Sequence, residues 1–311
     1  MEVITSTQNP KIKRLLALQE KSSERRKSGL FVVEGRRELQ HCVEAGYEIE
    51  SVFVEMKNEE SRFARNEELK LPSNPESNSH SSLKNIFTVS PHVYERIAYR
   101  DTTEGVVAIV KARHLTLGDI SCAALPPTGS EGVNGLTRCQ AVLSDRSRTP
   151  LLRMGKVGRG ALFIILDSVE KPGNLGAVLR SADAAGATAV IVCDPLTDLY
   201  NPNLIRASIG ACFTVPTVAC SSEECIRFLK DHGVQILTAQ LQDSELYYDT
   251  DMTGPTAIVM GTESTGLTDQ WRQAADAHIR IPMLGRLDSL NVSVSAAILL
   301  FEAVRQREIK G

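Results

Sequence analysis

The sequence lacks the long hydrophobic runs of a membrane protein and the leader of a secreted one. A membrane-spanning helix requires about 18 consecutive apolar residues, and none of the apolar stretches in this sequence is that long. Its first residues, MEVITSTQNPKIKR, have no apolar centre of the kind found in signal peptides. We therefore expect a cytoplasmic protein with no membrane partner.

Paired cysteine motifs are also missing. The 311 residues contain seven cysteines, an odd number, and no CxxC pair. Scattered thiols of this kind favour reduced side chains and argue against a zinc site, so the sequence predicts no metal. The seven are Cys42, Cys122, Cys139, Cys193, Cys212, Cys220 and Cys225.

A strong net charge is absent as well. The formal net charge is −3, which gives no global signature of nucleic-acid binding. Residues 1–37 nevertheless hold nine basic residues against four acidic ones. A surface that meets phosphates and an ordinary solvated helix face both explain this excess. The candidate phosphate contacts in this region are Lys11, Arg14, Arg25 and Arg36.

The remaining composition is that of a globular protein of about two domains, with 42% hydrophobic and 23% charged residues. In the first part, hydrophobic periodicity predicts an amphipathic helix at 9–27, a β-α-β segment over 30–54, and two strands around a helix over 86–110. Residues 56–82 are too polar to pack and indicate a mobile insertion. Residues 112–158 show no sustained period and indicate a flexible linker or insertion.

Strands and helices alternate in the second part, beginning with the near-continuous apolar run at 161–166. This alternation predicts an α/β fold whose parallel sheet is covered on both faces. The further strands are expected at 189–192, 213–218, 235–237, 257–260 and 278–281, and the helices at 174–185, 203–208, 222–231, just after 268, and 294–304.

Three stretches combine a strand-like run with a loop that contains glycine and polar residues. They are DSVEKPGNLGAVLRSADAAG at 167–186, IVMGTESTGL at 258–267 and IPMLGRLDSLNVSVSAAILLFEAVR at 281–305. Asn174 in the first is compatible with a simple helix N-cap as well as with a functional role. A dinucleotide-binding reading of GNLG does not fit the GxGxxG pattern and leaves the other two stretches unexplained.

Taken together and in this order, the three stretches resemble the three motifs of the SpoU (TrmH-type) RNA ribose methyltransferases of the SPOUT superfamily. The resemblance covers roughly residues 159–307, and FVVEGRRELQHCVEAG and TTEGVVAIV are similar to a small L30e-like domain. It implies an L30e-like RNA substrate-binding domain at 1–111, a linker at 112–158, and a SPOUT catalytic domain with a deep trefoil knot at 159–311. It also implies S-adenosyl-L-methionine (AdoMet) as cofactor, rRNA or tRNA as substrate, and a homodimer.

The resemblance also assigns roles to residues. Arg180, Asn174, Ser289 and Asn291 match catalytic positions, and Arg206 matches a position that faces RNA or a second subunit. An arginine side chain almost never loses its proton, so we expect Arg180 to clamp a phosphate rather than to act as a base. The positions that match the cofactor site are Gly261, Glu263, Ile281, Met283, Leu290 and Ser293.

Two alternatives remain open at this point. One is a SPOUT enzyme that methylates a base; Asn174 and Arg180 in the first motif favour ribose instead. The other is a non-catalytic RNA-binding module, which the presence of all three motifs disfavours. The last expected helix is apolar around most of its circumference, which favours burial on more than one side and is compatible with a dimer.

Overall fold

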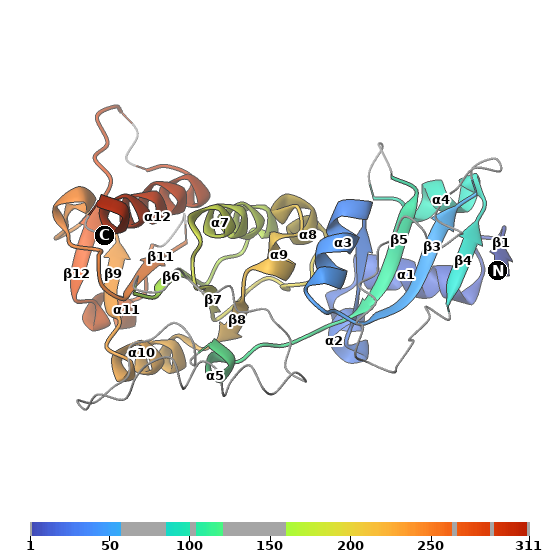
Figure 1. Ribbon diagram of the computed structural model, residues 1–311, viewed down its shortest axis with the longest axis horizontal. Coiled ribbons are helices and arrows are strands. Elements are labelled where there is room, and N and C mark those ends of the chain that lie inside the picture. The colour runs from blue at the N-terminus through green and yellow to red at the C-terminus, as the bar shows by residue number, and fades with distance from the viewer. Residues whose placement is uncertain are drawn as a thin grey trace. The chain divides into compact units, whose positions relative to one another are not determined.

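The computed structural model describes residues 2–56, 85–99, 104–120, 160–262, 266–286 and 289–309. They form two compact units (Figure 1). Unit 1 comprises Met1–Arg113 and Asp198–Phe213, and unit 2 comprises His114–Thr197 and Thr214–Gly311. Residues 57–82 of the expected insertion and 121–158 of the expected linker lie outside the described residues.

Unit 1 is built on a mixed sheet with the strand order β1-β4-β3-β5-β2. The strands β1, β4 and β3 run parallel, and β5 is antiparallel to both β3 and β2. The strands are β1 (Glu2–Ile4), β2 (Leu30–Glu34), β3 (Ile49–Glu55), β4 (Ile86–Val89) and β5 (Val106–Lys111), and the helices are α1 (Pro10–Glu20), α2 (Ser22–Ser28), α3 (Arg36–Glu44), α4 (Pro91–Ile97) and α8 (Pro202–Ser208).

The single helix expected at 9–27 is in fact two helices. The chain becomes extended at Lys21, with φ −112° and ψ 113°, and α2 then continues to Gly29, where φ is 65°. The break is stabilised by Arg25, whose Nη1 donates to the carbonyls of Leu18 and Gln19 at 2.7 and 3.0 Å. These carbonyls lie at the end of α1, where an α-helix leaves its last carbonyls without a helical partner.

Residues 198–213 join unit 1 through aromatic contacts. Phe31 stacks on Tyr200 with ring centroids 4.3 Å apart and on Phe213 at 5.9 Å, and Tyr47 lies edge-on to Phe213. Phe213 therefore does not begin a strand as the sequence analysis expected. It lies in α9 (Ala211–Thr214), and the strand β8 begins only at Thr217, because the Phe213 side chain is needed in the aromatic cluster.

Unit 2 is a seven-stranded sheet in which every pair is parallel, in the order β10-β12-β9-β11-β6-β7-β8. The helices α7 and α12 cover one face and α10 and α11 the other (Figure 1), which confirms the predicted parallel α/β fold. The strands are β6 (Leu162–Asp167), β7 (Ala189–Cys193), β8 (Thr217–Cys220), β9 (Gln235–Ala239), β10 (Glu245–Leu246), β11 (Thr256–Met260) and β12 (Ala277–Arg280), and the helices are α5 (Leu117–Ile120), α7 (Pro172–Ala185), α10 (Ser222–Asp231), α11 (Asp269–Ala274) and α12 (Val292–Ile309).

The end of α12 is anchored by one buried arginine. Arg307 donates from Nε to the Met252 carbonyl at 2.9 Å, from Nη1 to Gly160 at 2.7 Å and from Nη2 to Gly254 at 2.6 Å. These carbonyls belong to the segments that lead into β6 and β11. The last turn of the last helix thus holds the starts of two central strands. None of the helices in the described part of the chain has the length and apolarity needed to cross a bilayer.

Candidate active site

A cleft of about 340 Å³ opens in unit 2 where β9, β11 and β12 end and α12 begins. The carboxyl ends of parallel strands face one edge of a sheet, and this edge is where α/β proteins bind ligands. The lining residues come from the ends of β9, β11 and β12, the loops that follow them, α11 and the first turn of α12: Ala239, Gln240, Leu241, Gln242, Met260, Gly261, Thr262, Gly266, Leu267, Arg272, Ile279, Arg280, Ile281, Met283, Ser289, Leu290, Val292 and Ser295.

Gly261 is required by the way the loop after β11 returns on itself. The backbone groups of Thr262 and Gly266 exchange two hydrogen bonds of 3.1 Å. A Cβ atom at Gly261 would lie 2.3 Å from the carbonyl carbon of Gly266 and 2.6 Å from the backbone nitrogen of Leu267. No side chain fits at this distance, so glycine keeps the loop closed and its main chain accessible to the cleft. Glu263, predicted as part of the cofactor site, lies outside the described residues.

The structure gathers most of the other predicted cofactor residues in the same cleft. Ile281 and Met283 line it half-buried, and Leu290 lines it with 40% of its surface exposed. Ser289, predicted as catalytic, lines it as well. Ser293 does not line the cleft. Its hydroxyl donates instead to Oδ1 of Asn291 at 2.6 Å, so its position is structural and adjacent to the site.

A hydrogen bond joins the first and third motifs. Nδ2 of Asn291 donates to Oδ1 of Asn174 at 3.1 Å, which connects the loop before α12 to the start of α7. Oδ1 of Asn291 also accepts from the backbone of Ser293 at 2.9 Å, as a helix cap does. Asn174 itself is not a cap, because α7 begins at Pro172 and Lys171 occupies the cap position. The side chain of Asn174 thus bonds to the third motif.

Arg180 lies on the solvent side of α7. Its neighbours Val178 and Leu179 are fully buried, whereas Arg180 is exposed. Within the described residues, no hydrogen bond or ion pair holds its guanidinium, and no contact brings it to the cleft. The side chain is therefore available to an anionic partner that approaches α7 from solvent.

The prediction that Arg25 contacts RNA is wrong. Its side chain is only 5% exposed, and its Nε donates to the Asp198 carboxylate at 2.5 Å, so it holds unit 1 together. Arg14, Arg36 and Arg206 are exposed. Lys11 is half-buried, pairs with Glu2 at 2.6 Å and lies 4.3 Å above the Phe87 ring. Arg14 pairs with Glu50 and Arg36 donates to the Glu104 carbonyl, and both pairs lie on the surface of unit 1.

Sequence reasoning missed the loop that follows β9. Gln240, Leu241 and Gln242 line the cleft, together with Arg272 of α11 and Arg280 of β12. The one available signal was position, because this loop follows a predicted strand of a parallel sheet and must reach the ligand-binding edge. Neither the glutamines nor the arginines form a recognisable motif, so their residue types alone gave no sign.

The structure also assembles three cysteines that are scattered in the sequence. The sulfur atoms of Cys193, Cys220 and Cys225 all lie within 4.8 Å of one another in unit 2. Hydrogen bonds from Cys193 and Cys225 lower the pKa of Cys220. The group contains no CxxC pair, so spacing along the chain could not reveal it.

Stretches of both units match known protein families. Residues 161–301 match the SpoU rRNA Methylase family, and residues 9–108 match the MRM3-like substrate binding domain. A 23S rRNA (guanosine-2′-O-)-methyltransferase RlmB of Pseudomonas putida is 39% identical over 169 residues, which cover 54% of this chain and 64% of the relative. The protein of the same name from Xanthomonas axonopodis pv. citri is 38% identical over 186 residues, covering 57% of this chain and 74% of the relative. The match thus spans about two thirds of the length of these relatives.

Solved structures resemble the whole chain. An RNA 2′-O ribose methyltransferase aligns with a TM-score of 0.70 and 34% identity, over 98% of this chain and 99% of the other. An AdoMet-bound rRNA methyltransferase from Sinorhizobium meliloti aligns with a TM-score of 0.75 and 27% identity, over 98% and 97% of the two chains.

Proposed function

The chain belongs to the SpoU rRNA methylase family, and from this premise we propose that it transfers a methyl group from AdoMet to a ribose 2′-oxygen of ribosomal RNA. The observation that carries the proposal is the cleft of unit 2, where Gly261, Ile281, Met283 and Leu290 lie together. Relatives that are 38% and 39% identical to this chain are named 23S rRNA (guanosine-2′-O-)-methyltransferases. A similar structure was solved with AdoMet bound.

The residues of the cleft fit AdoMet. Gly261, Thr262 and Gly266 line the cleft, and main-chain groups of such a loop can bind the polar parts of a nucleoside. Met283 and Leu290 present apolar surface to its base. When bound, AdoMet supplies a methyl group that its sulfonium already activates, so the protein has to orient the reactants and exclude water.

The remaining task is to make a ribose 2′-hydroxyl reactive and to hold it in place. Arg180 supplies a permanent positive charge on the exposed side of α7. Its planar group of donors grips a phosphate next to the target ribose and lowers the pKa of the 2′-hydroxyl, without accepting a proton itself. The Asn174–Asn291 hydrogen bond fixes the starts of α7 and α12, and thereby the position of Ser289 at the cleft.

Unit 1 is the RNA-binding part of this proposal. Its family match is to a substrate binding domain, and Arg14, Arg36 and Arg206 lie exposed on its surface, where arginines can meet phosphates. We propose the boundaries predicted from the sequence: an L30e-like domain at 1–111, a linker at 112–158 and a SPOUT domain at 159–311. The deep trefoil knot belongs to the same proposal, supported by the SPOUT resemblance and by the packing of α12 against α7.

The protein is proposed to act as a homodimer. One face of α12 is buried on the sheet of unit 2, through Val292, Ala296, Leu299 and Ala303 among others. A second apolar face runs along the same helix and stays partly exposed, with Val294 at 46% and Phe301 at 48%. Ala297, Ile298 and Val304 lie half-buried on this second face. An apolar face of this length at helical spacing suits a second copy of the chain.

Two measurements test the function. Calorimetry with the purified full-length chain should give AdoMet binding, and its absence would favour the non-catalytic RNA-binding module. Mapping of 2′-O-methyl groups in total RNA, with and without the gene, should show the loss of a ribose methyl in large-subunit rRNA. Loss of a tRNA ribose methyl or of a base methyl would instead overturn the substrate or the reaction.

A further inference from the structure

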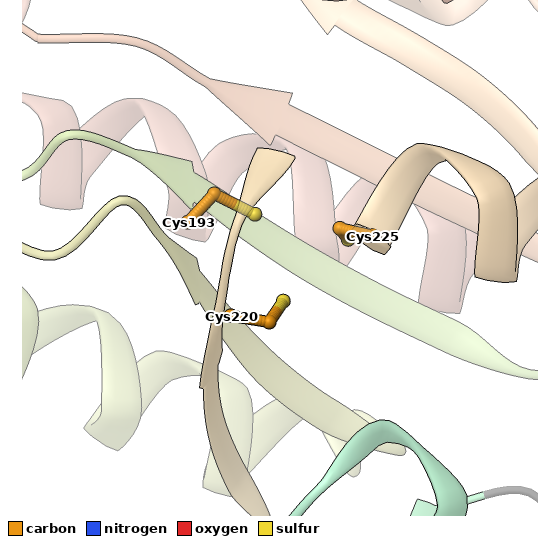
Figure 2. A group of neighbouring side chains, drawn as sticks. All are labelled: Cys193, Cys220 and Cys225. Carbon is orange, nitrogen blue, oxygen red and sulfur yellow. The ribbon is translucent and has the colours of Figure 1, made fainter. Parts of the chain in front are cut away.

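Three cysteines converge in unit 2 at a place that methyl transfer does not use. Cys193 ends β7, Cys220 ends β8 and Cys225 lies in the first turn of α10. Figure 2 shows the Cys193 and Cys220 side chains pointing into the space between the two strands and the start of α10. All three sulfur atoms lie within 4.8 Å of one another. The AdoMet cleft lies at β9, β11 and β12, with β6 between it and this group in the sheet order.

The backbone places these thiols independently of any loop. Cys193 and Cys220 are register partners in the parallel β7–β8 pair, so their side chains leave the sheet on the same face. The helix α10 covers that face and brings Cys225 onto it. Cys193 and Cys225 are fully buried and Cys220 is half-buried. The group is therefore open to solvent only on the Cys220 side.

The spacing of the sulfur atoms suits a thiolate-bound metal ion. Thiolates about 2.3 Å from a zinc ion lie about 3.8 to 4.0 Å from one another. Contraction of the observed spacing of up to 4.8 Å to this value is within the reach of small side-chain rotations. Among the His, Cys, Asp and Glu side chains of the described residues, these three form a group with this proximity.

The charges around the group favour a divalent ion. Three thiolates carry three negative charges, and the carboxylates of Asp194 and Glu224 are close enough to Cys220 to act on it. A divalent ion leaves a smaller uncompensated negative charge here than a monovalent one does. The first turn of α10, capped by Ser221, has its unpaired N–H groups at the start of the helix, and their positive potential favours the thiolate form of Cys225. Soft thiolate ligands suit copper(I), iron–sulfur clusters and zinc, and the preference for a single divalent ion points to zinc.

We propose that Cys193, Cys220 and Cys225 bind one Zn²⁺ ion as three thiolates, with water at the fourth position on the open Cys220 side. Each thiol that binds releases its proton to solvent, and no oxidant or reductant takes part. The strand β8 is the terminal strand of the sheet, with β7 as its sheet neighbour, and the metal ties this strand to both β7 and α10.

The test uses the full-length chain with Cys122→Ser and Cys139→Ser, which removes two thiols elsewhere in the sequence. The reduced protein is equilibrated with zinc in a competing chelator, and bound zinc per chain and melting temperature are measured. We expect one ion per chain and a higher melting temperature with zinc. Adding Cys220→Ser should abolish both. Adding Cys212→Ser, a half-buried cysteine outside the group, should preserve both.

X-ray absorption at the zinc edge of the loaded parent chain provides a readout that needs no change in the group. Three sulfur neighbours are expected; a shell of only nitrogen and oxygen would show that the ion is bound elsewhere. The proposal also fails if the parent chain takes up no zinc, or if a folded Cys220→Ser chain retains it. In either case the three cysteines only fill the core, and circular dichroism of each variant establishes that it is folded.

Discussion

The shape of the cleft depends on Gly261 having no side chain. A methyl group there would overlap the backbone of Gly266 and Leu267 and force the loop after β11 open. We expect Gly261→Ala to weaken AdoMet binding at least about tenfold, or ~1.4 kcal/mol. Calorimetry checks this. Gly254→Ala is the matched control, because a Cβ atom at Gly254 meets nothing within 4 Å. Equal losses in both variants would contradict the role of Gly261.

Substitution of Arg180 should affect methyl transfer without affecting cofactor binding. It is exposed on α7 and does not line the cleft. Arg180→Ala should therefore keep AdoMet affinity and lose methyl transfer to RNA. Arg180→Lys should also be poor, because a point charge cannot replace a planar group of five donors. AdoMet calorimetry and a methylation assay on total RNA are measured on the same preparations. Full activity in Arg180→Ala would remove the residue from the mechanism.

Arg25 and Arg26 are adjacent in the sequence and opposite in environment. Arg25 is buried against Asp198, whereas Arg26 is exposed. We expect Arg25→Ala to destabilise unit 1 by about 3 kcal/mol, since it leaves the partly buried Asp198 carboxylate without its charged partner. Arg26→Ala should leave the melting temperature unchanged and at most reduce RNA affinity at low salt. Thermal unfolding and RNA titration of both variants decide the point. A stable Arg25→Ala chain with reduced RNA affinity would restore the original prediction.

The error over Arg25 shows what charge counting can and cannot predict. A cluster of basic residues in the sequence indicates a basic surface, but it does not say which side chain turns inward. Arg25 turns inward because α1 ends at Glu20 and leaves carbonyls for it to bind, and because Asp198 lies nearby. That partner is 173 positions away in the chain. No local pattern contains this information.

At the scale of elements, α12 depends on its last turn. Arg307 is buried and donates to backbone carbonyls at the starts of β6 and β11, whereas the Arg305 side chain is about half exposed and pairs with Glu302. We expect Arg307→Ala to lower the free energy of unfolding by about 2 to 4 kcal/mol and Arg305→Ala by less than about 1 kcal/mol. Urea unfolding of both variants measures the difference. Similar losses would mean that the carbonyls are satisfied without Arg307.

The sequence predicted the order of elements in unit 2 well and their boundaries less well. Apolar runs such as 161–166 and the alternation of strands with helices were sufficient for a parallel sheet. Residues of the second and third loop motifs line the cleft at one edge of this sheet. The failures occur where tertiary contacts override local pattern. Phe213 was assigned to a strand because it is apolar and precedes Val215, but its ring is required by Phe31.

At the scale of the whole molecule, the second apolar face of α12 should bring two chains together. Light scattering at micromolar concentration should give about twice the 34.0 kDa mass of one chain. Phe301→Asp places a charge on that face and should give monomers. A parent chain that scatters as a monomer would reject the dimer.

A mixed-chain experiment asks whether two subunits share one active site. An Arg180→Ala chain and an Asn291→Ala chain are each expected to be inactive alone. Partial recovery of methyl transfer in the mixture would place the two residues of a working site on different chains. Absence of recovery, with mixed dimers demonstrated by differential tags, would place both residues on one chain.

The interleaving of the two units has a consequence for how the protein is made. The ribosome delivers β1 to β5 first, yet the rings that cover Phe31 belong to Tyr200 and Phe213. A nascent chain shorter than 213 residues therefore carries the N-terminal sheet with part of its aromatic surface uncovered. Chaperones and proteases recognise such surface, so translation that stops before Phe213 yields a product marked for removal. Unit 2 is completed later still, when Arg307 is made and anchors the starts of β6 and β11.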